Sequence, residues 1–292
     1  MGALHPECPS RLSAINDYLI AHGLDHGLLY RDAPLATCEQ LLRVHSAAHL
    51  ARLKRSSPAL GIVHLDPDTA MNPHTLQAAL RAAGAGVLAV DLVMAGEVPN
   101  AFCAVRPPGH HAERTGASGF CFFNNVAVAA AHALQAHGLA RVAIVDFDVH
   151  HGNGTEDCFK GNEQVLMVGM FQHPFYPYSG TDDPAPNMLN VPLPRGTEGD
   201  EFRQVVFDIW LPRLRQFRPE MILVSAGFDA HLEDDLGGMK LVEMDFVWIT
   251  EQLMQIAAES ARGRIVSMLE GGYVHSALAR SVAAHLKVLA GI

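Results

Sequence analysis

The chain has 292 residues, of which 49% are hydrophobic and 18% charged, a composition that excludes intrinsic disorder and fits a chain with a large core. Its 21 Lys and Arg residues against 31 Asp and Glu residues give a net charge of −10, so we expect no nucleic-acid partner bound through a basic surface. Five cysteines without a C-x-x-C pair, and a start without an apolar leader, favour a reducing, cytoplasmic location.

The first long apolar segment predicts a helix. Pro73 lies at its first turn, and a run rich in Ala, Leu and Val continues to a stop at Gly96. Arg81 and Asp91 interrupt the most apolar part, residues 78–94, so we expect a helix buried in the protein and no membrane span.

Strand-like and helical segments alternate along the rest of the chain. Apolar runs predict strands at residues 98–105, 141–148, 165–170, 221–227 and 264–269. Helices are expected from Asn124 or Asn125 to Gly138, over 202–210 with Pro212 kinking or ending the helix, and over 246–261. The alternation predicts one α/β domain over residues 1–292.

Polar residues follow four of these strands directly. They are His110 and His111, Asp148 and His150, Asp229, and the segment from Glu270 to Tyr273. In an open parallel sheet, ligands bind beyond the carboxyl ends of the strands. We therefore expect a functional site at that edge.

The residue types at two of these strand ends favour a metal site. Asp146, Asp148 and His150 share one face of a strand, because side chains two apart point the same way. With Asp229 from another strand, Asp148 and His150 form an Asp/His/Asp set, which suits a catalytic zinc with one open position. Each residue alone is more commonly a helix cap, a turn former or a packing residue. Asp146 lies one step deeper, where a charge needs a partner or a cation.

Three further side chains could carry the chemistry. His110 and His111 follow a constrained Pro-Pro-Gly turn, and a neutral histidine beside a metal-bound water can act as general base and then acid. The phenol of Tyr273 could donate to an oxyanion. Taken alone, each of these residues is more commonly structural.

Five segments together resemble the zinc-dependent histone deacetylases in residues, order and spacing, over His5 to about Tyr273. They are RPPGHH at 106–111, GFCFFNN at 119–125, DFDVHHGNG at 146–154, AGFD at 226–229 and LEGGY at 269–273. The resemblance implies the single-domain arginase-deacetylase fold, a central parallel sheet with helices on both faces. Asn153 stands where class I members carry Asp, so the chain looks closer to class II enzymes and bacterial histone deacetylase-like amidohydrolases. Relatives usually have a strand before His5, so we expect the first strand to be missing or the start truncated.

The resemblance also assigns roles. Asp148, His150 and Asp229 become ligands of one Zn²⁺ per chain, and Tyr273 becomes the oxyanion stabiliser. His111 is then the general base and acid. His110 resembles an electrostatic partner supported by Asp146. Asn153 would contact His111 in place of a carboxylate, so without an anion there we expect a less stabilised imidazolium.

Residues around a substrate tunnel follow from the same resemblance. Phe120 and Tyr176 resemble its aromatic walls, with core packing as the alternative, and Gly119 would let the backbone approach the substrate. Leu236 matches the apolar residue of lysine deacetylases, where polyamine deacetylases of the class II type have Glu. Arg11 resembles an arginine of the acetate-exit channel, with a surface salt bridge as the alternative.

Two departures from the family pattern bear on ions and on the tunnel. Gly169 replaces a serine that helps to bind a structural K⁺ near Asp146, which leaves Asp146 and backbone carbonyls as the ligands expected for K⁺ there. Tyr178 replaces a rim glycine and is expected to narrow the entrance.

The predicted reaction is therefore removal of acetyl or short acyl groups from lysine side chains. The acidic run Glu233-Asp234-Asp235 favours a different substrate, an acetylpolyamine or another small acylated amine, although a charge run is commonly only a solvated face. An arginase-like ureohydrolase with two manganese ions and a non-catalytic acetyl-lysine binder also stay open as functions. The sequence leaves the oligomeric state open.

Overall fold

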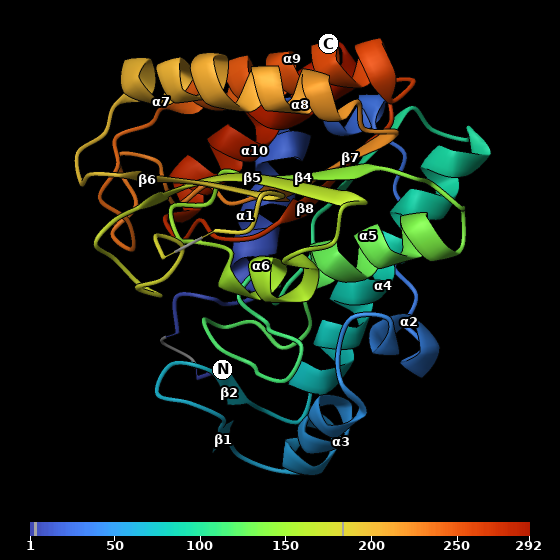
Figure 1. The fold of residues 1–292 in the computed structure, drawn as a ribbon. Helices are drawn as coiled ribbons and strands as arrows, with labels where there is room; N and C mark the ends of the chain where they lie inside the picture. The colour runs from blue at the N-terminus through green and yellow to red at the C-terminus, as the bar shows by residue number, and fades with distance from the viewer. Residues whose placement is uncertain (3–4, 183) are drawn as a thin grey trace.

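The computed structural model describes residues 1–2, 5–182 and 184–292. At its centre lies a six-stranded parallel sheet in the order β3-β8-β7-β4-β5-β6 (Figure 1). The strands are β3 (Asn100–Cys103), β4 (Val142–Asp146), β5 (Val165–Gln172), β6 (Met188–Leu193), β7 (Met221–Ala226) and β8 (Ile265–Leu269). The inner strands are buried and mostly apolar, as a sheet covered on both faces requires.

Helices cover both faces of this sheet, which confirms the predicted α/β class. One layer contains α1 (Ser10–Ala21), α7 (Gly199–Val205), α8 (Leu211–Phe217), α9 (Glu243–Ser260) and α10 (His275–Ala290), and the other contains α4 (Thr75–Ala95), α5 (Asn125–Gln135) and α6 (Asn153–Phe159). Val142 and Ile144 of β4 pack toward α4 and α5, whereas Ala143 and Val145 pack toward α9 and α10. This alternation along one strand builds two cores.

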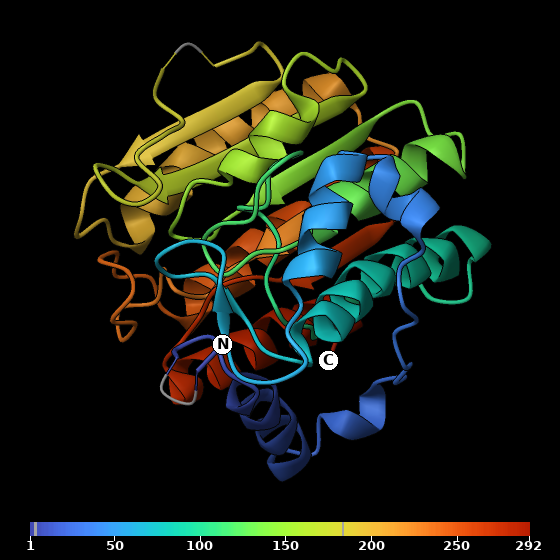
Figure 2. The same ribbon diagram turned by 90° about the horizontal axis from the view of Figure 1, so that it is seen from below.

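Smaller elements extend the layer of α4 and α5 (Figure 2). They are α2 (Cys38–Leu42), α3 (Ala47–Ser56), β1 (Val63–His64) and β2 (Ala70–Met71). A short 3₁₀ turn, Asp25–Gly27, contacts α1 instead. Among the described residues, α4 alone is long and apolar enough to cross a membrane. It packs instead against α5, where a Cβ on Gly86 would lie 3.0 Å from Cβ of Ala129, so the predicted buried helix is confirmed.

Several predicted boundaries differ from those of the structure. β3 is shorter than residues 98–105, and α5 ends before Gly138. Of the two alternatives for Pro212, ending the helix is wrong, because a π-helical segment, Val206–Trp210, joins α7 to α8 and Pro212 sits in the first turn of α8; a kink there stays a prediction. Proline is tolerated there because a first-turn N–H has no partner within the helix.

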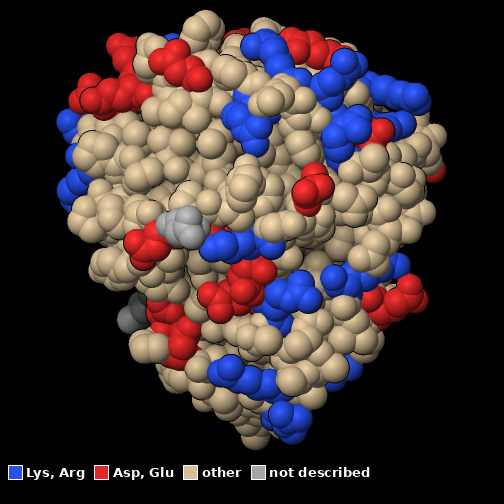
Figure 3. All heavy atoms as spheres, viewed as in Figure 1, with Lys and Arg blue, Asp and Glu red and all other residues tan. Residues whose placement is uncertain are grey.

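The strand order fixes where a site can form. From β4 the chain proceeds to β5 and β6 on one side, whereas β7 leads to β8 on the other side. The topological switch point therefore lies between the neighbours β4 and β7, and in open parallel sheets ligands bind beyond the carboxyl ends of the strands at such a point. On the face seen in Figure 3, acidic and basic side chains are interspersed.

Candidate metal centre and active site

Asp148, His150 and Asp229 meet at the switch point, the first two beyond β4 and the third beyond β7, with ligand atoms within 4.8 Å of one another. Nδ1 of His150 lies 2.9 Å from Oδ1 of Asp148 and 3.3 Å from Oδ2 of Asp229. Ligands of a tetrahedral zinc lie roughly 3.3 Å apart, so the spacing fits such an ion. Oδ2 of Asp229 is buried and has no hydrogen-bond partner, as expected for an oxygen that a cation would take.

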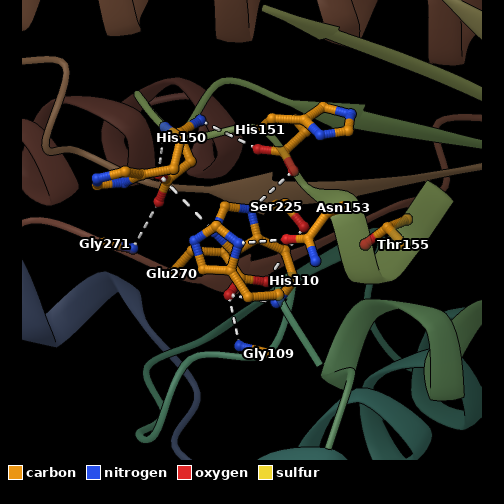
Figure 4. A network of polar contacts seen from close by, with 12 residues as sticks. Gly109, His110, His150, His151, Asn153, Thr155, Ser225, Glu270 and Gly271 are labelled. Carbon is orange, nitrogen blue, oxygen red and sulfur yellow. Dashed lines mark hydrogen bonds and ion pairs between the residues drawn. The ribbon is translucent and has the colours of Figure 1, made fainter. Parts of the chain in front are cut away.

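Backbone groups orient the two carboxylates, one of them the N–H of Gly271, which Figure 4 labels beside His150. The N–H of Gly271 donates to Oδ2 of Asp148 at 2.9 Å, and the N–H of Val149 donates to Oδ1 of Asp229 at 3.0 Å. A Cβ at position 271 would overlap the Asp229 carboxylate, so the close approach of this backbone requires glycine. The ligand set is therefore held by the chain itself.

The two buried carboxylates, Asp148 and Asp229, need a positive charge beside them. Burial opposes a charged His150, but its hydrogen bond with Asp148 and the nearby carboxylate of Asp229 raise its pKa to about 10. Burial and the neighbouring charge of Asp148 raise the pKa of Asp229 to about 7. The carboxylates can be balanced by a proton on the imidazole or by a metal cation that binds the neutral ring.

His110 lies beside this group and is paired with Asp146. Its Nδ1 is 2.9 Å from Oδ2 of Asp146, and both side chains are buried. Burial lowers the pKa of His110, but the charges of Asp146 and Asp148 outweigh it and raise the pKa well above the usual value. The charged form of His110 is thus favoured by its carboxylate partners, and the buried His110–Asp146 pair lies next to the three candidate ligands.

His111, unlike His110, is hydrogen-bonded to an amide and not to a carboxylate. Its Nδ1 lies 2.7 Å from Oδ1 of Asn153, and because an amide oxygen only accepts, Nδ1 carries the proton and Nε2 keeps its lone pair. Burial, followed by the charges of His110 and His150, lowers the pKa of His111 well below the usual value. A neutral imidazole with a free Nε2 is the form that a general base needs.

Gly119 contacts the catalytic candidate His111 itself. A Cβ on Gly119 would overlap the imidazole, and Gly119 has φ of 54°. The close approach of this backbone to the His111 ring therefore requires glycine, and the expected approach to a substrate stays a prediction.

The predicted aromatic walls flank the same centre and are half-buried, which disfavours core packing as their role. The ring of Phe120 lies 5.9 Å from that of Tyr273, and the ring of Tyr176 lies 5.2 Å from that of His111. Leu236 is also half-buried, in the loop after β7. Tyr178 is exposed with φ of 61°, and its effect on an entrance stays a prediction.

The Tyr273 loop is fixed from two sides. Arg11 is fully buried, donates to the carbonyls of Gly272 and Glu270 at 2.7 and 2.5 Å, and lies 4.9 Å from the Tyr273 ring centroid. The alternative of a surface salt bridge for Arg11 is therefore wrong. Oδ2 of Asp234 accepts the N–H of Tyr273 at 2.6 Å.

Sequence reasoning missed Glu270 as a functional side chain. Its carboxylate accepts the N–H groups of Gly109 and His110 at 2.6 and 3.1 Å, and the hydroxyl of Ser225 at 3.1 Å (Figure 4). It thereby joins the loop after β3 to the ends of β7 and β8. The one available signal was its place in LEGGY, directly after an apolar strand.

A second group of metal-ligand type, Asp91, His132 and His137, lies on α4 and near the end of α5. Arg43 donates to Nδ1 of His132 at 2.7 Å, which leaves the ring proton on Nε2, the atom that faces Asp91. Both Nε2 atoms lie 2.7 Å from one Asp91 oxygen, so hydrogen bonds account for this group without a metal.

The geometry of the site agrees with the similarity of the chain to a known family. Residues 5–289 match the model of the histone deacetylase domain. The chain belongs to the histone deacetylase family. This makes it an amide-bond hydrolase and disfavours both an arginase-like activity and a non-catalytic role.

The sequence of the chain is similar to those of other family members over most of its length. It is 41% identical to a histone deacetylase-like amidohydrolase of Pseudomonas aeruginosa, over 92% of this chain and 72% of the relative. It is 38% identical to the human protein named polyamine deacetylase HDAC10, over 98% of this chain and 45% of the relative. The crystal structure of the HDA15 HD domain superposes with a TM-score of 0.94 at 36% identity, covering 100% of this chain and 85% of that one. The predicted fold is confirmed.

Proposed function

We propose that this family member is a zinc-dependent deacetylase that removes acetyl or short acyl groups from lysine side chains. The observation that carries the proposal is the convergence of Asp148, His150 and Asp229 at the switch point, with Oδ2 of Asp229 buried and without a hydrogen-bond partner. Two carboxylates and one imidazole suit a catalytic zinc. A bound zinc would supply Lewis acidity to the acyl carbonyl and lower the pKa of the attacking water.

The proton transfers and the stabilisation of the oxyanion would be carried out by side chains of this protein. Nε2 of His111, free because Nδ1 is bonded to Asn153, accepts the proton of the attacking water and later returns a proton to the leaving amine. Tyr273 donates its phenol proton toward the oxyanion of the acyl group. Its pKa, raised well above the usual value by burial and by the charge of Asp229, keeps that proton in place. The products are a carboxylate and a free amine.

Two features support lysine over a polyamine as the substrate. Leu236 contributes no charge to bind a second ammonium group. The acidic run is largely occupied, because Glu233 pairs with Arg280 at 2.7 Å and Asp234 accepts backbone N–H groups. The alternative of a polyamine substrate is supported by the similarity to the relative named as a polyamine deacetylase.

One experiment tests both the zinc-dependent deacetylation and the preference for lysine over a polyamine. The purified protein is analysed for metal and assayed on an acetyl-lysine peptide and on acetylspermidine, before and after chelation. We expect one zinc per chain, turnover that chelation abolishes and zinc restores, and a higher kcat/KM for the peptide. A zinc-loaded protein that hydrolyses neither compound would refute the proposal, and a preference for acetylspermidine would replace lysine by a polyamine.

Potassium near Asp146 stays a prediction, as does a cytoplasmic location. Gly169 pairs with Asp146 across β4 and β5, and a Cβ there would lie 3.7 Å from Cβ of Asp146. The absence of a nucleic-acid partner is likewise a prediction.

A further inference from the structure

Asn153 connects the His111 ring to another carboxylate, that of Glu113. Oδ1 of Asn153 faces Nδ1 of His111 at 2.7 Å, while Nδ2 of Asn153 donates to Oε1 of Glu113 at 2.9 Å. The expected contact of Asn153 with His111 in place of a carboxylate is therefore present, and the nearest carboxylate on this path, that of Glu113, contacts Asn153 and not the ring.

The backbone holds these three side chains in place. The backbone carbonyl of Glu113 lies 2.9 Å from Nδ1 of His45. The backbone N–H of Glu113 donates to the carbonyl of Gly116 at 3.0 Å. Asn153 begins α6, and a Cβ on the next residue, Gly154, would overlap the carbonyl of Ala112. The first turn of α6 thus lies directly against residues 111–113.

This arrangement decides which way the amide points. In the reverse orientation, Oδ1 of Asn153 would face the carboxylate of Glu113, and two acceptors would repel each other. The same reversal would turn the amide NH₂ group toward His111, so Nδ1 would have to accept and the ring proton would move to Nε2. Nε2 would then have no lone pair for a proton from water.

We infer that Glu113 is a positioning residue for the general base: it fixes the Asn153 amide so that His111 keeps its proton on Nδ1. The inference rests on the proposed function, because it assigns Glu113 a purpose only if His111 is the base. Glu113 reaches His111 through Asn153 and so acts on the base indirectly.

The test is a double-mutant cycle on zinc-loaded protein with an acetyl-lysine peptide. Glu113→Ala removes the acceptor, so we expect kcat to fall about tenfold with KM nearly unchanged. Glu113→Gln keeps an acceptor oxygen but loses the charge, and we expect a loss of about threefold. Asn153→Asp places two carboxylates against each other and should lower kcat about tenfold as well.

The double variant Asn153→Asp with Glu113→Gln discriminates a positioning role from a general structural one. There the amide introduced at position 113 can donate to the new carboxylate, so Glu113→Gln should raise kcat of the Asn153→Asp enzyme although it lowers kcat of the wild type. Zinc content and the melting temperature are measured for each variant, and Glu163→Gln, at an exposed site, controls for the loss of one charge.

The outcomes separate the two proposals. If zinc-loaded wild type is inert, the proposed function fails and this inference fails with it. If the wild type is active but Glu113→Gln changes kcat in the same direction in both backgrounds, or Glu113→Ala leaves kcat unchanged, only the role of Glu113 is overturned.

Discussion

Gly119 and His111 touch so closely that the glycine has no room for a side chain: a Cβ at position 119 would overlap the imidazole ring. Gly119 has φ of 54°, so both the space and the backbone conformation favour glycine. The imidazole is bounded by this backbone on one side and by Asn153 at its Nδ1. Its position is therefore set by two segments, residues 118–120 and the start of α6.

Gly119→Ala should lower kcat by about 10²-fold, because it displaces a base that must lie within hydrogen-bond reach of the water. Steady-state kinetics and metal analysis check this, and zinc should remain bound. Gly138→Ala is the matched control: Gly138 has φ of 67° and no atom near its hypothetical Cβ. It shares the backbone strain, so it should lower the melting temperature and leave kcat intact. Equal losses of kcat in both variants would contradict this assignment.

His111→Ala and Tyr273→Phe should each lower kcat by about 10²-fold or more while zinc stays bound. The reason is that neither side chain is in the proposed ligand set, whereas each acts on a proton or on developing charge. Single-turnover rates with matched zinc content measure the effect. Near-normal turnover in either variant would remove that residue from its role.

Asp229→Asn should lose zinc on dialysis, together with activity. Asn replaces a charged ligand by a neutral one at the buried oxygen that has no hydrogen-bond partner. Zinc should also raise the melting temperature of the wild type, because it binds only the folded chain at this site, and this rise should vanish in the variant. Asp91→Asn, in the group that hydrogen bonds account for, is the control and should retain the full zinc content. Loss of zinc from Asp91→Asn instead would move the metal site to α4 and α5.

The convergence of the three proposed metal ligands could be predicted from the sequence because two local rules place them. Asp148 and His150 follow a buried strand at a spacing of two, so they share a face, and Asp229 follows another strand of the same parallel sheet. The strand order that makes β4 and β7 neighbours was not predictable in this way. It depends on which apolar strands pair across long stretches of chain.

The contacts of the side chains that support the site, those of Glu270, Arg11 and Glu113, could not be predicted either, because they join segments that only the fold brings together. The bond from Gly109 to Glu270 joins residues 161 apart, and the bond from Arg11 to Gly272 joins residues 261 apart. Before folding, Glu113 is only an acidic residue in a loop. Its role depends on the first turn of α6, a helix that the sequence pattern did not predict. Burial of Arg11 was missed because an arginine is rarely buried unless its donors are satisfied.

His285 should make the protein less stable in acid. Its ring is buried between Thr250 and Ser267, 2.7 and 2.9 Å from their hydroxyls, and burial lowers its pKa to about 3. A folded pKa below the unfolded value of about 6.5 means that the unfolded chain binds the proton first. The stabilisation is full above pH 6.5 and is lost as pH falls toward 3. Between pH 7 and pH 5 this one group should cost roughly 2 kcal/mol of unfolding free energy.

Denaturant unfolding at several pH values measures this slope. His285→Gln should be less stable than the wild type at pH 7, yet its unfolding free energy should depend less on pH between 7 and 5, because the titrating group is gone. His26→Gln is the control, since the His26 side chain is 87% exposed and its removal should leave the slope unchanged. His45, whose pKa burial also lowers to about 3, should retain part of the acid sensitivity in His285→Gln. A wild-type slope that His285→Gln leaves unaltered would show that the proton enters elsewhere.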